Sequence, residues 1–276
     1  MRPLILVLLL MGTGPGARAA EPTPTMPADT SADAWQALAN FRPEQALPRF
    51  ERLAPMGADN VRAVRFGTAL SLLAQPSAIP NRVGKARAIL AALAADESDD
   101  IALGARFYLG RLAEFQADPP DPVQAAAIFR RLIAEYPDSI WAQVAVSRLA
   151  IVLLYTAAGP AGPAGKIAAA ELLQKSARHP LAIMELHLVI SDAVFHYRLP
   201  DGLALPHLIA AEQAGGLDPA TRADVLVQIG ELSRLTGQPG PAARYYRIFL
   251  AEYPRDARQY PIRQKLASLG AAKPTP

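Results

Sequence analysis

The residues whose types and spacing suit chemistry best are a trio of polar side chains between positions 181 and 198. Glu185, Asp192 and His196 are separated by seven and four residues, so they share one face if the segment is helical. Glu185 and Asp192 would then stand ~10 Å apart along the axis, too far to bind one ion together, whereas Asp192 and His196 are close enough. The trio is either a two-residue metal site or, as we favour, a polar strip that lines a binding groove.

No other pattern typical of catalysis or cofactor binding is present. The four histidines are His179, His187, His196 and His207. They form no HExxH motif, and the chain has no GxSxG motif for a nucleophilic serine. The glycine-rich run at 159–165 lacks the spacing of a phosphate-binding loop, so we interpret it as a turn. We therefore expect no catalytic residue, no metal and no cofactor, and keep a metal-dependent helical enzyme as the least favoured alternative.

The elements that would position these residues follow from a spaced pattern of Ala, a large apolar residue four positions on, and Pro twelve positions on. The pattern occurs at Ala125, Phe129 and Pro137, at Ala168, Leu172 and Pro180, and at Ala242, Tyr246 and Pro254. Looser copies begin at Ala46 and Ala86, and a degenerate one has His207 in place of Ala. Apolar residues four apart, closed by a proline, predict a helix that ends near that proline.

The unit at 223–256 is the clearest copy and resembles the tetratricopeptide repeat. The residues that carry the resemblance are Leu226, Ile229, Gly230, Ala242, Tyr246, Phe249 and Pro254. A glycine inside a helix suits the close approach of a neighbouring helix. The resemblance implies an all-α fold, a right-handed superhelical solenoid of about six helix pairs, which we place at residues 34–270.

In that family the first helix of each pair lines the concave groove. Carried over by register, and together with the polar trio, the groove residues are Phe107, Arg111, Glu114, Phe115, Tyr155, Glu185, Asp192, His196, Asp224 and Arg234. Exposed aromatic and Arg side chains are typical of peptide-binding surfaces. The alternative, that Phe107 and Phe115 pack between helices, remains open because these residues are eight apart and share a face.

The N-terminus predicts an export signal over residues 1–19. Arg2 precedes a short apolar run at 4–11, and residues 17–19 form a small-x-small cleavage site. The run is shorter than the ~20 residues that span a membrane, and we expect no other transmembrane segment. A polar, Pro-rich lead-in at 20–33 and a tail at 271–276 complete the predicted organisation.

Composition narrows the class of protein further. The 276-residue chain has no Cys, which excludes a lipid anchor on Cys, a disulfide and a thiolate zinc site. Cleavage after Ala19 removes Arg2 and Arg18 and no acidic residue, so 28 basic residues become 26 against 25 acidic ones. The positive charge of the whole chain therefore gives no indication of nucleic-acid binding.

The segments 129–150 and 246–270 are similar to those of exported tetratricopeptide proteins of Gram-negative bacteria that act in outer-membrane assembly and cell-envelope coordination. The resemblance implies a non-catalytic periplasmic scaffold, with secretion as an alternative, that binds a peptide or protein partner of the cell envelope. The partner's identity and the oligomeric state stay open.

A second hypothesis is a binder of cell-wall glycan or anionic envelope polymer. It would use a basic C-terminal face made of Arg244, Tyr245, Tyr246, Arg247, Tyr253, Arg255, Arg258, Tyr260 and Arg263. Basic residues interleaved with aromatics can bind anionic polymers. The export signal argues against nucleic acid, and we favour a solvated capping face, with Tyr246 as a packing position.

Overall fold

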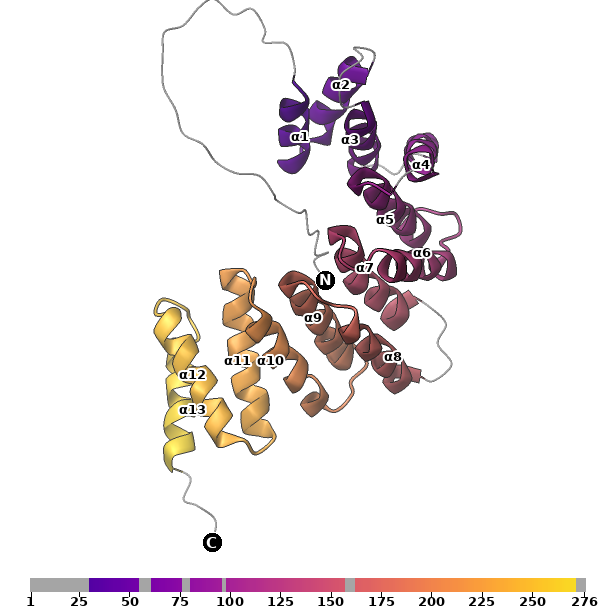
Figure 1. The fold of residues 1–276 in the computed structure, drawn as a ribbon. Helices are drawn as coiled ribbons and strands as arrows, with labels where there is room; N and C mark the ends of the chain where they lie inside the picture. Colours follow the sequence, from indigo (N-terminus) through magenta and orange to yellow (C-terminus); the bar gives the residue numbers. More distant parts are fainter. Residues whose placement is uncertain (1–29, 55–60, 76–79, 96–97, 157–161, 272–276) are drawn as a thin grey trace, which may run out of the picture. The chain divides into compact units, whose positions relative to one another are not determined.

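The structure, a computed structural model, describes residues 30–54, 61–75, 80–95, 98–156 and 162–271 (Figure 1). Within these ranges the chain forms thirteen α-helices and no β-strand, which confirms the all-α prediction. Helix follows helix along these ranges, and several successive helices pack against each other. The predicted signal peptide at 1–19 and nearly all of the predicted tail lie outside the described residues. No helix in the described ranges combines the length and the apolar character that a membrane crossing requires.

The α-helices are α1 (Ser31–Ala39), α2 (Pro43–Leu53), α3 (Val61–Ala74), α4 (Pro80–Ala95), α5 (Asp100–Phe115), α6 (Pro122–Glu135), α7 (Ile140–Ile151), α8 (Gly162–Glu171), α9 (Pro180–His196), α10 (Leu205–Ala214), α11 (Pro219–Leu235), α12 (Pro239–Glu252) and α13 (Gln259–Ala271). A π-helix, η2 (Val152–Thr156), extends α7, and short 3₁₀ helices occur at η3 (Leu172–Lys175) and η4 (Asp201–Leu203).

Helix starts are encoded by prolines and by capping side chains. Pro stands in the first turn of α2, α6, α9, α10, α11 and α12, where its missing N–H costs nothing. Asp121 and Asp218 cap α6 and α11 by accepting hydrogen bonds from backbone N–H groups. At α1, Thr30 and Asp33 form a capping box, so this helix begins inside the segment that the sequence predicted as a lead-in.

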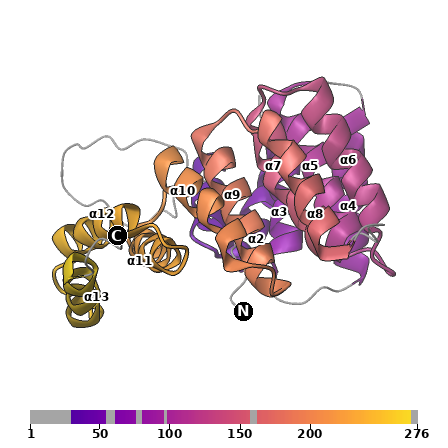
Figure 2. The same cartoon turned by 90° about the horizontal axis from the view of Figure 1, so that it is seen from below.

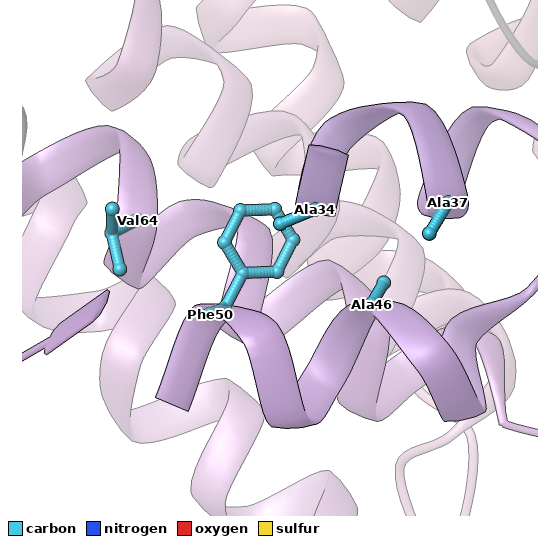
Figure 3. Packing of buried hydrophobic residues seen from close by; sticks show 5 residues of the cluster. All are labelled: Ala34, Ala37, Ala46, Phe50 and Val64. Atoms are coloured by element: carbon cyan, nitrogen blue, oxygen red, sulfur yellow. The ribbon is translucent and has the colours of Figure 1, made fainter. Parts of the chain in front are cut away.

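The chain divides into two compact units, residues 1–112 and 113–276, where the sequence predicted one continuous domain over 34–270. In the first unit, the core of α1, α2 and α3 is built around the ring of Phe50, with Ala34, Ala46 and Val64 against it (Figure 3). Trp35 meets Phe50 edge to face at 5.1 Å between ring centroids. Small residues surrounding one large ring let neighbouring helices pack closely.

The recurring Ala and large residue occupy the core of the helix pairs, as predicted. The pairs Ala46 and Phe50, Ala86 and Leu90, Ala125 and Phe129, and Ala242 and Tyr246 are all fully buried. The glycines beside them are required by sterics. A Cβ on Gly67 would lie 2.3 Å from the Phe50 ring, and one on Gly230 would lie 2.4 Å from the Tyr246 ring. The predicted close approach at Gly230 is thus confirmed, with the Tyr246 ring as the contacting group.

The prediction for the fourth pair is wrong. Ala168 is exposed and Leu172 is 67% exposed, while Ile167 and Ala170 are buried instead. The reason is that α8 ends at Glu171 and continues as the 3₁₀ turn η3, which changes the phase of the following side chains. Pro180 stands in the first turn of α9, so it begins a helix where the sequence predicted that it ends one.

In the second unit, α7 packs against both α6 and α9, and α10 contacts both α9 and α11 (Figure 2). The buried side chain of Gln143 on α7 ties two turns together. Its Nε2 donates to the carbonyls of Pro137 and Ser176 at 2.7 and 3.0 Å, and its Oε1 accepts from the N–H groups of Arg178 and His179. One amide therefore holds the end of α6 beside the end of η3.

Candidate functional site

Three of the predicted groove residues meet where η2 passes α9. The Tyr155 ring stands edge to face with the His196 ring, with 5.2 Å between centroids, and stacks on Tyr197 at 6.3 Å. Asp192 lies one helical turn before His196 on α9, and its charge acts on Tyr155. Tyr155 is 37% exposed, and His196 and Asp192 are exposed as well. We call Tyr155, Asp192, His196 and Tyr197 the tyrosine–histidine cluster.

The π-helix explains how Tyr155 reaches this position. Val152 and Leu154 are fully buried, so Tyr155 and Thr156 turn outward. The Thr156 hydroxyl donates back to the carbonyl of Val152 at 3.1 Å, which satisfies a backbone group at the helix end. π-turns inside helices often occur at functional sites, because the extra residue re-aims the side chains.

A second layer of contacts fixes the cluster from behind. The Tyr197 hydroxyl donates to the carbonyl of Leu154. Lys166 on α8 donates to the same carbonyl at 3.2 Å, and its Nζ stands 5.8 Å from the centre of the Tyr197 ring. The aromatic rings are thus held by polar contacts from two helices, which suits a preformed binding surface.

The electrostatics of the cluster favour a neutral tyrosine beside a carboxylate. Partial burial, with a further contribution from the charge of Asp192, raises the pKa of Tyr155 to about 12. Desolvation raises the pKa of Asp192 as well. At neutral pH Tyr155 is therefore a hydrogen-bond donor with an accessible π-face, next to an acidic group. Such an arrangement can bind a cationic side chain through cation–π and charge contacts.

A buried ion pair joins the end of α5 to α7. The Arg148 Nη2 on α7 donates to both carboxylate oxygens of Glu114 at 2.9 Å, and Glu114 is fully buried. The Arg148 guanidinium also lies 5.2 Å from the centre of the Phe115 ring. Beside it, Ser147 donates to Glu185 on α9 at 2.9 Å. Desolvation raises the pKa of Glu185, although the Ser147 hydrogen bond and the Arg148 charge oppose the shift.

The structure corrects two of the predicted groove residues. Phe107 and Glu114 are each only 3% exposed. Phe107 packs edge to face on Tyr108, and Glu114 is enclosed by its ion pair, so neither side chain can meet a ligand directly. Phe115, by contrast, is 52% exposed, while Arg111 is partly buried. Sequence register placed these residues on the correct helix, but it could not separate the packing face from the accessible face.

The two predicted groove residues of α11 belong to a different cluster. Asp224 forms an ion pair with Arg258, in the turn before α13, at 2.6 Å, and Arg234 pairs with Glu231 at 3.1 Å. Glu231 also binds Lys265 of α13 at 2.7 Å. The Lys265 and Arg258 contacts join α11 to α13 and to the turn before it, whereas the Arg234–Glu231 pair lies within α11.

The basic C-terminal face is neutralised in part. Arg258 is bound by both Asp224 and Asp256, and the Tyr245 and Tyr246 side chains are buried. The packing role predicted for Tyr246 is confirmed. Arg244, Arg247 and Arg255 are exposed, and of the four tyrosines of this face two are buried while Tyr260 is 69% exposed.

Sequence reasoning missed a histidine pair in the interior. His187 on α9 and His207 on α10 face each other with 2.9 Å between their Nδ1 atoms, and His207 Nε2 lies 3.3 Å from Glu171 of α8. Burial, with a smaller contribution from His207, lowers the pKa of His187 to about 4, and burial lowers the pKa of His207 despite Glu171. The sequence did contain a signal for this pair, because His207 occupies the anchor position that other copies of the repeat pattern give to Ala.

The described residues contain no grouping of three or more His, Asp or Glu side chains arranged to hold a metal ion. Asp192 and His196 share a face of α9, as their spacing predicted, but His196 packs against Tyr155 and Tyr197.

Comparisons with known proteins identify a repeat in the middle of the chain. The family model for the tetratricopeptide repeat matches residues 105–139, which contain the second half of α5 and all of α6. Among solved structures, the chain is similar to a thermophilic tetratricopeptide-repeat protein of Thermus thermophilus, with 17% sequence identity, a TM-score of 0.32, and coverage of 87% of this chain and 96% of that one. A search of curated proteins gives no match. The helix pair at 105–139 is therefore similar to a tetratricopeptide repeat.

Proposed function

We propose that the protein is a non-catalytic scaffold that binds a segment of a protein partner on the face formed by η2 and α9. Tetratricopeptide repeats act typically as protein-interaction scaffolds, and the repeat match at 105–139 supports that class. The observation that carries the proposal is the tyrosine–histidine cluster. It is accessible, aromatic and anchored from behind by Lys166 and Leu154.

The chemistry of the cluster favours a partner segment with a Lys or Arg side chain. The Tyr155 ring offers a π-face, and Asp192 offers a carboxylate that no described cation engages by an ion pair. A cation over an aromatic ring contributes about 0.5–1 kcal/mol at an exposed site, and a nearby carboxylate adds a similar amount. Asp192 would repel an anionic partner, so the site favours a positively charged segment over a negatively charged one.

We further propose that the protein acts in the periplasm of a bacterium and that its partner belongs to the cell envelope. Both parts rest on the export signal predicted at 1–19 and on the sequence resemblance to envelope repeat proteins. N-terminal sequencing of the protein from fractionated cells should give a chain that begins at Ala20, recovered with the periplasm. A chain that retains Met1 in the cytoplasmic fraction would refute this placement.

Photocrosslinking in cells tests the binding face. A photoreactive phenylalanine analogue placed at Tyr155 should capture a discrete protein, and the same analogue at Tyr260, a 69% exposed residue of α13, should not. Tyr260 is the matched control because it is an exposed tyrosine on the last helix of the chain. Equal capture from both positions would argue against a specific site at η2 and α9.

The expected effect of substitution is measurable once the partner is captured. Asp192→Lys should weaken binding by about tenfold or more, because it removes an attractive charge and introduces a repulsive one. Asp192→Asn should have a smaller effect, and Tyr260→Ala none. Binding by Asp192→Lys that equals wild type would overturn the assignment of a cationic partner segment.

A further inference from the structure

An apolar trough lies beside α7, between α6 and the α8–η3 segment. Its volume is about 600 Å³, and its floor and walls include Ile133 of α6, Leu149 of α7 and Leu172 of η3. This volume falls in the range of ligand sites in proteins, roughly 300–1,000 Å³. None of the residues of the tyrosine–histidine cluster lines it, so the trough is a separate surface.

The trough exists because the fourth helix pair departs from the repeat. In the other pairs an apolar residue at the second anchor position is buried, as Phe129 and Tyr246 are. Leu172 occupies that position in the sequence pattern, but the change from α8 to the 3₁₀ turn leaves it 67% exposed. A large apolar side chain exposed over an apolar hollow marks a surface that a partner can cover.

The shape of the trough follows from the two helices that flank it. Gln143 binds the carbonyls of Pro137 and Ser176, so α6 and η3 end side by side at one end. Arg130 lines the trough seven residues before Pro137, which is ~10 Å along the axis of α6. The trough is therefore about as long as two turns of an α-helix.

The charges at the trough are all of one sign. Arg130 stands toward one end, and Lys175 and Arg178 stand at the other, while no acidic residue lines the trough. Arg178 is paired with Asp138 at 2.5 Å. Within the described part of the chain, no carboxylate lies within ion-pair distance of Arg130 or Lys175.

We propose that this trough is a second docking site, which binds an acidic amphipathic helix of a protein partner. On the partner helix, Leu-like side chains at i, i+3 or i+4, and i+7 would cover Leu172 and Ile133. Asp or Glu residues at the two ends of that helix would meet Arg130 and Lys175. Positive charge at both ends is the feature that favours such a helix over a fatty acid. A fatty acid carries a single anionic head and would satisfy one end only.

The test uses the purified chain and a fluorescein-labelled peptide of about twelve residues, with Leu at the helical spacing and Glu elsewhere. Fluorescence anisotropy should show saturable binding that weakens at high salt, because exposed charge contacts are screened. A peptide with Lys in place of each Glu should not bind. Arg130→Glu should weaken binding about tenfold.

Arg131→Glu is the matched control for that variant. Arg131 is the next residue of α6, is 79% exposed in its side chain and does not line the trough. The control should bind as wild type, and Leu172→Asp should abolish binding while circular dichroism confirms that it folds. Chemical-shift mapping should place the changes on Ile133, Leu149 and Leu172.

Three outcomes would overturn the proposal. One is equal loss of binding in Arg130→Glu and Arg131→Glu, which would mean that only net charge matters. The second is chemical-shift changes confined to helices outside the trough. The third is binding of oleate, but not of the acidic peptide, with the changes at Leu172, which would assign the trough to a single-headed lipid. Binding of the peptide should be unchanged in Asp192→Lys, so failure here is distinguishable from failure of the proposed function.

Discussion

Arg148 illustrates how a single residue can hold two helices together. Its guanidinium is bound to the carboxylate of Glu114, which is completely shielded from solvent, and it also lies over the exposed ring of Phe115. An ionised carboxylate in such a place is tolerated only because a cation and two short hydrogen bonds compensate for its lost hydration. The pair therefore orders the end of α5 against α7.

Removal of one partner should cost much more than removal of both. Arg148→Ala should lower the free energy of unfolding by about 3–5 kcal/mol, because Glu114 stays buried without a cation. The double variant Glu114→Gln with Arg148→Met should be less damaging than Arg148→Ala alone. Urea unfolding followed by circular dichroism measures both.

Arg131→Ala is the control for the Arg148 variant. It breaks the exposed pair of Arg131 with Glu135 and should cost less than about 0.5 kcal/mol. If the Glu114 and Arg148 substitutions simply add, the two side chains do not act as a coupled pair.

The His187 and His207 pair makes the stability of the folded chain depend on pH. With the two Nδ1 atoms 2.9 Å apart, one ring must donate and the other accept, so the contact requires at least one neutral ring. The pKa of His187 falls from 6.5 to about 4 on folding. Between these values the unfolded chain binds more protons than the folded chain, so the stability is present above pH 6.5 and is lost as the pH falls toward 4.

Thermal unfolding at several pH values measures this response. Between pH 6.5 and pH 4 we expect a loss of about 1–2 kcal/mol from His187, a range reduced for its partial exposure. His187→Asn should flatten the dependence in that range. His196→Asn, a change at an exposed histidine of the same helix, should retain it. An identical pH profile for all three proteins would contradict the assignment.

At the scale of the elements, the glycine and aromatic contacts set the distance between helices. Tyr246 of α12 lies against Gly230 of α11, and Phe50 of α2 lies against Gly67 of α3. The ring fills the volume that a side chain on the glycine would need. The Tyr246 hydroxyl also donates to Glu231, which holds the ring in place. The helix pair therefore has little room to adjust to an added methyl group.

Gly230→Ala should destabilise the protein by about 1–3 kcal/mol through overpacking, although Ala favours a helix more than Gly does. Gly240→Ala in α12 is the control, because its Cβ would meet no atom within 4 Å. The control should be neutral or slightly stabilising. Replacing Tyr246 by Leu in the Gly230→Ala background should recover part of the loss. Equal melting temperatures for the two alanine variants would show that the close contact between Gly230 and Tyr246 does not affect stability.

The sequence was most informative about elements that repeat. Ala125 with Phe129 and Ala242 with Tyr246 specify both the helix and its buried face, because small and large residues at fixed spacing have one efficient packing. The pattern failed at Ala168 and Leu172, since nothing in it signals that α8 gives way to a 3₁₀ turn. Glycine and proline around 159–165 marked a break, but they could not give the phase of the helix that follows.

For the whole molecule, the two candidate surfaces are made by different residues. The tyrosine–histidine cluster belongs to η2 and α9, and the trough is lined by α6, α7, the α8–η3 segment and Leu153 of η2. No residue is shared between them. The spacing of Asp192 and His196 predicted their common face, whereas the contributions of Tyr155 and Leu172 depend on how η2 and η3 turn, which sequence spacing cannot specify.

Independent surfaces should bind independently. Saturating the trough with the acidic peptide should leave the affinity for the captured partner unchanged within about twofold, and the reverse should hold by linkage. Titration of one ligand in the presence of the other measures the coupling. A change larger than about fivefold in either direction would show that the two surfaces communicate through α7.

Because of the π-helix at 152–156, the tyrosine–histidine cluster can be altered by the loss of one residue, without any substitution. Its turn holds one residue more than an α-helical turn, and that extra residue is what sends Tyr155 toward His196. Loss of a single codon within this segment would restore the α-helical turn and rotate Tyr155 by about 100° around the axis. Val152 lies at the start of the segment, so its buried contacts would be kept. A lineage could thus discard this partner by one in-frame deletion, or gain it by one insertion, without a substitution elsewhere in the chain.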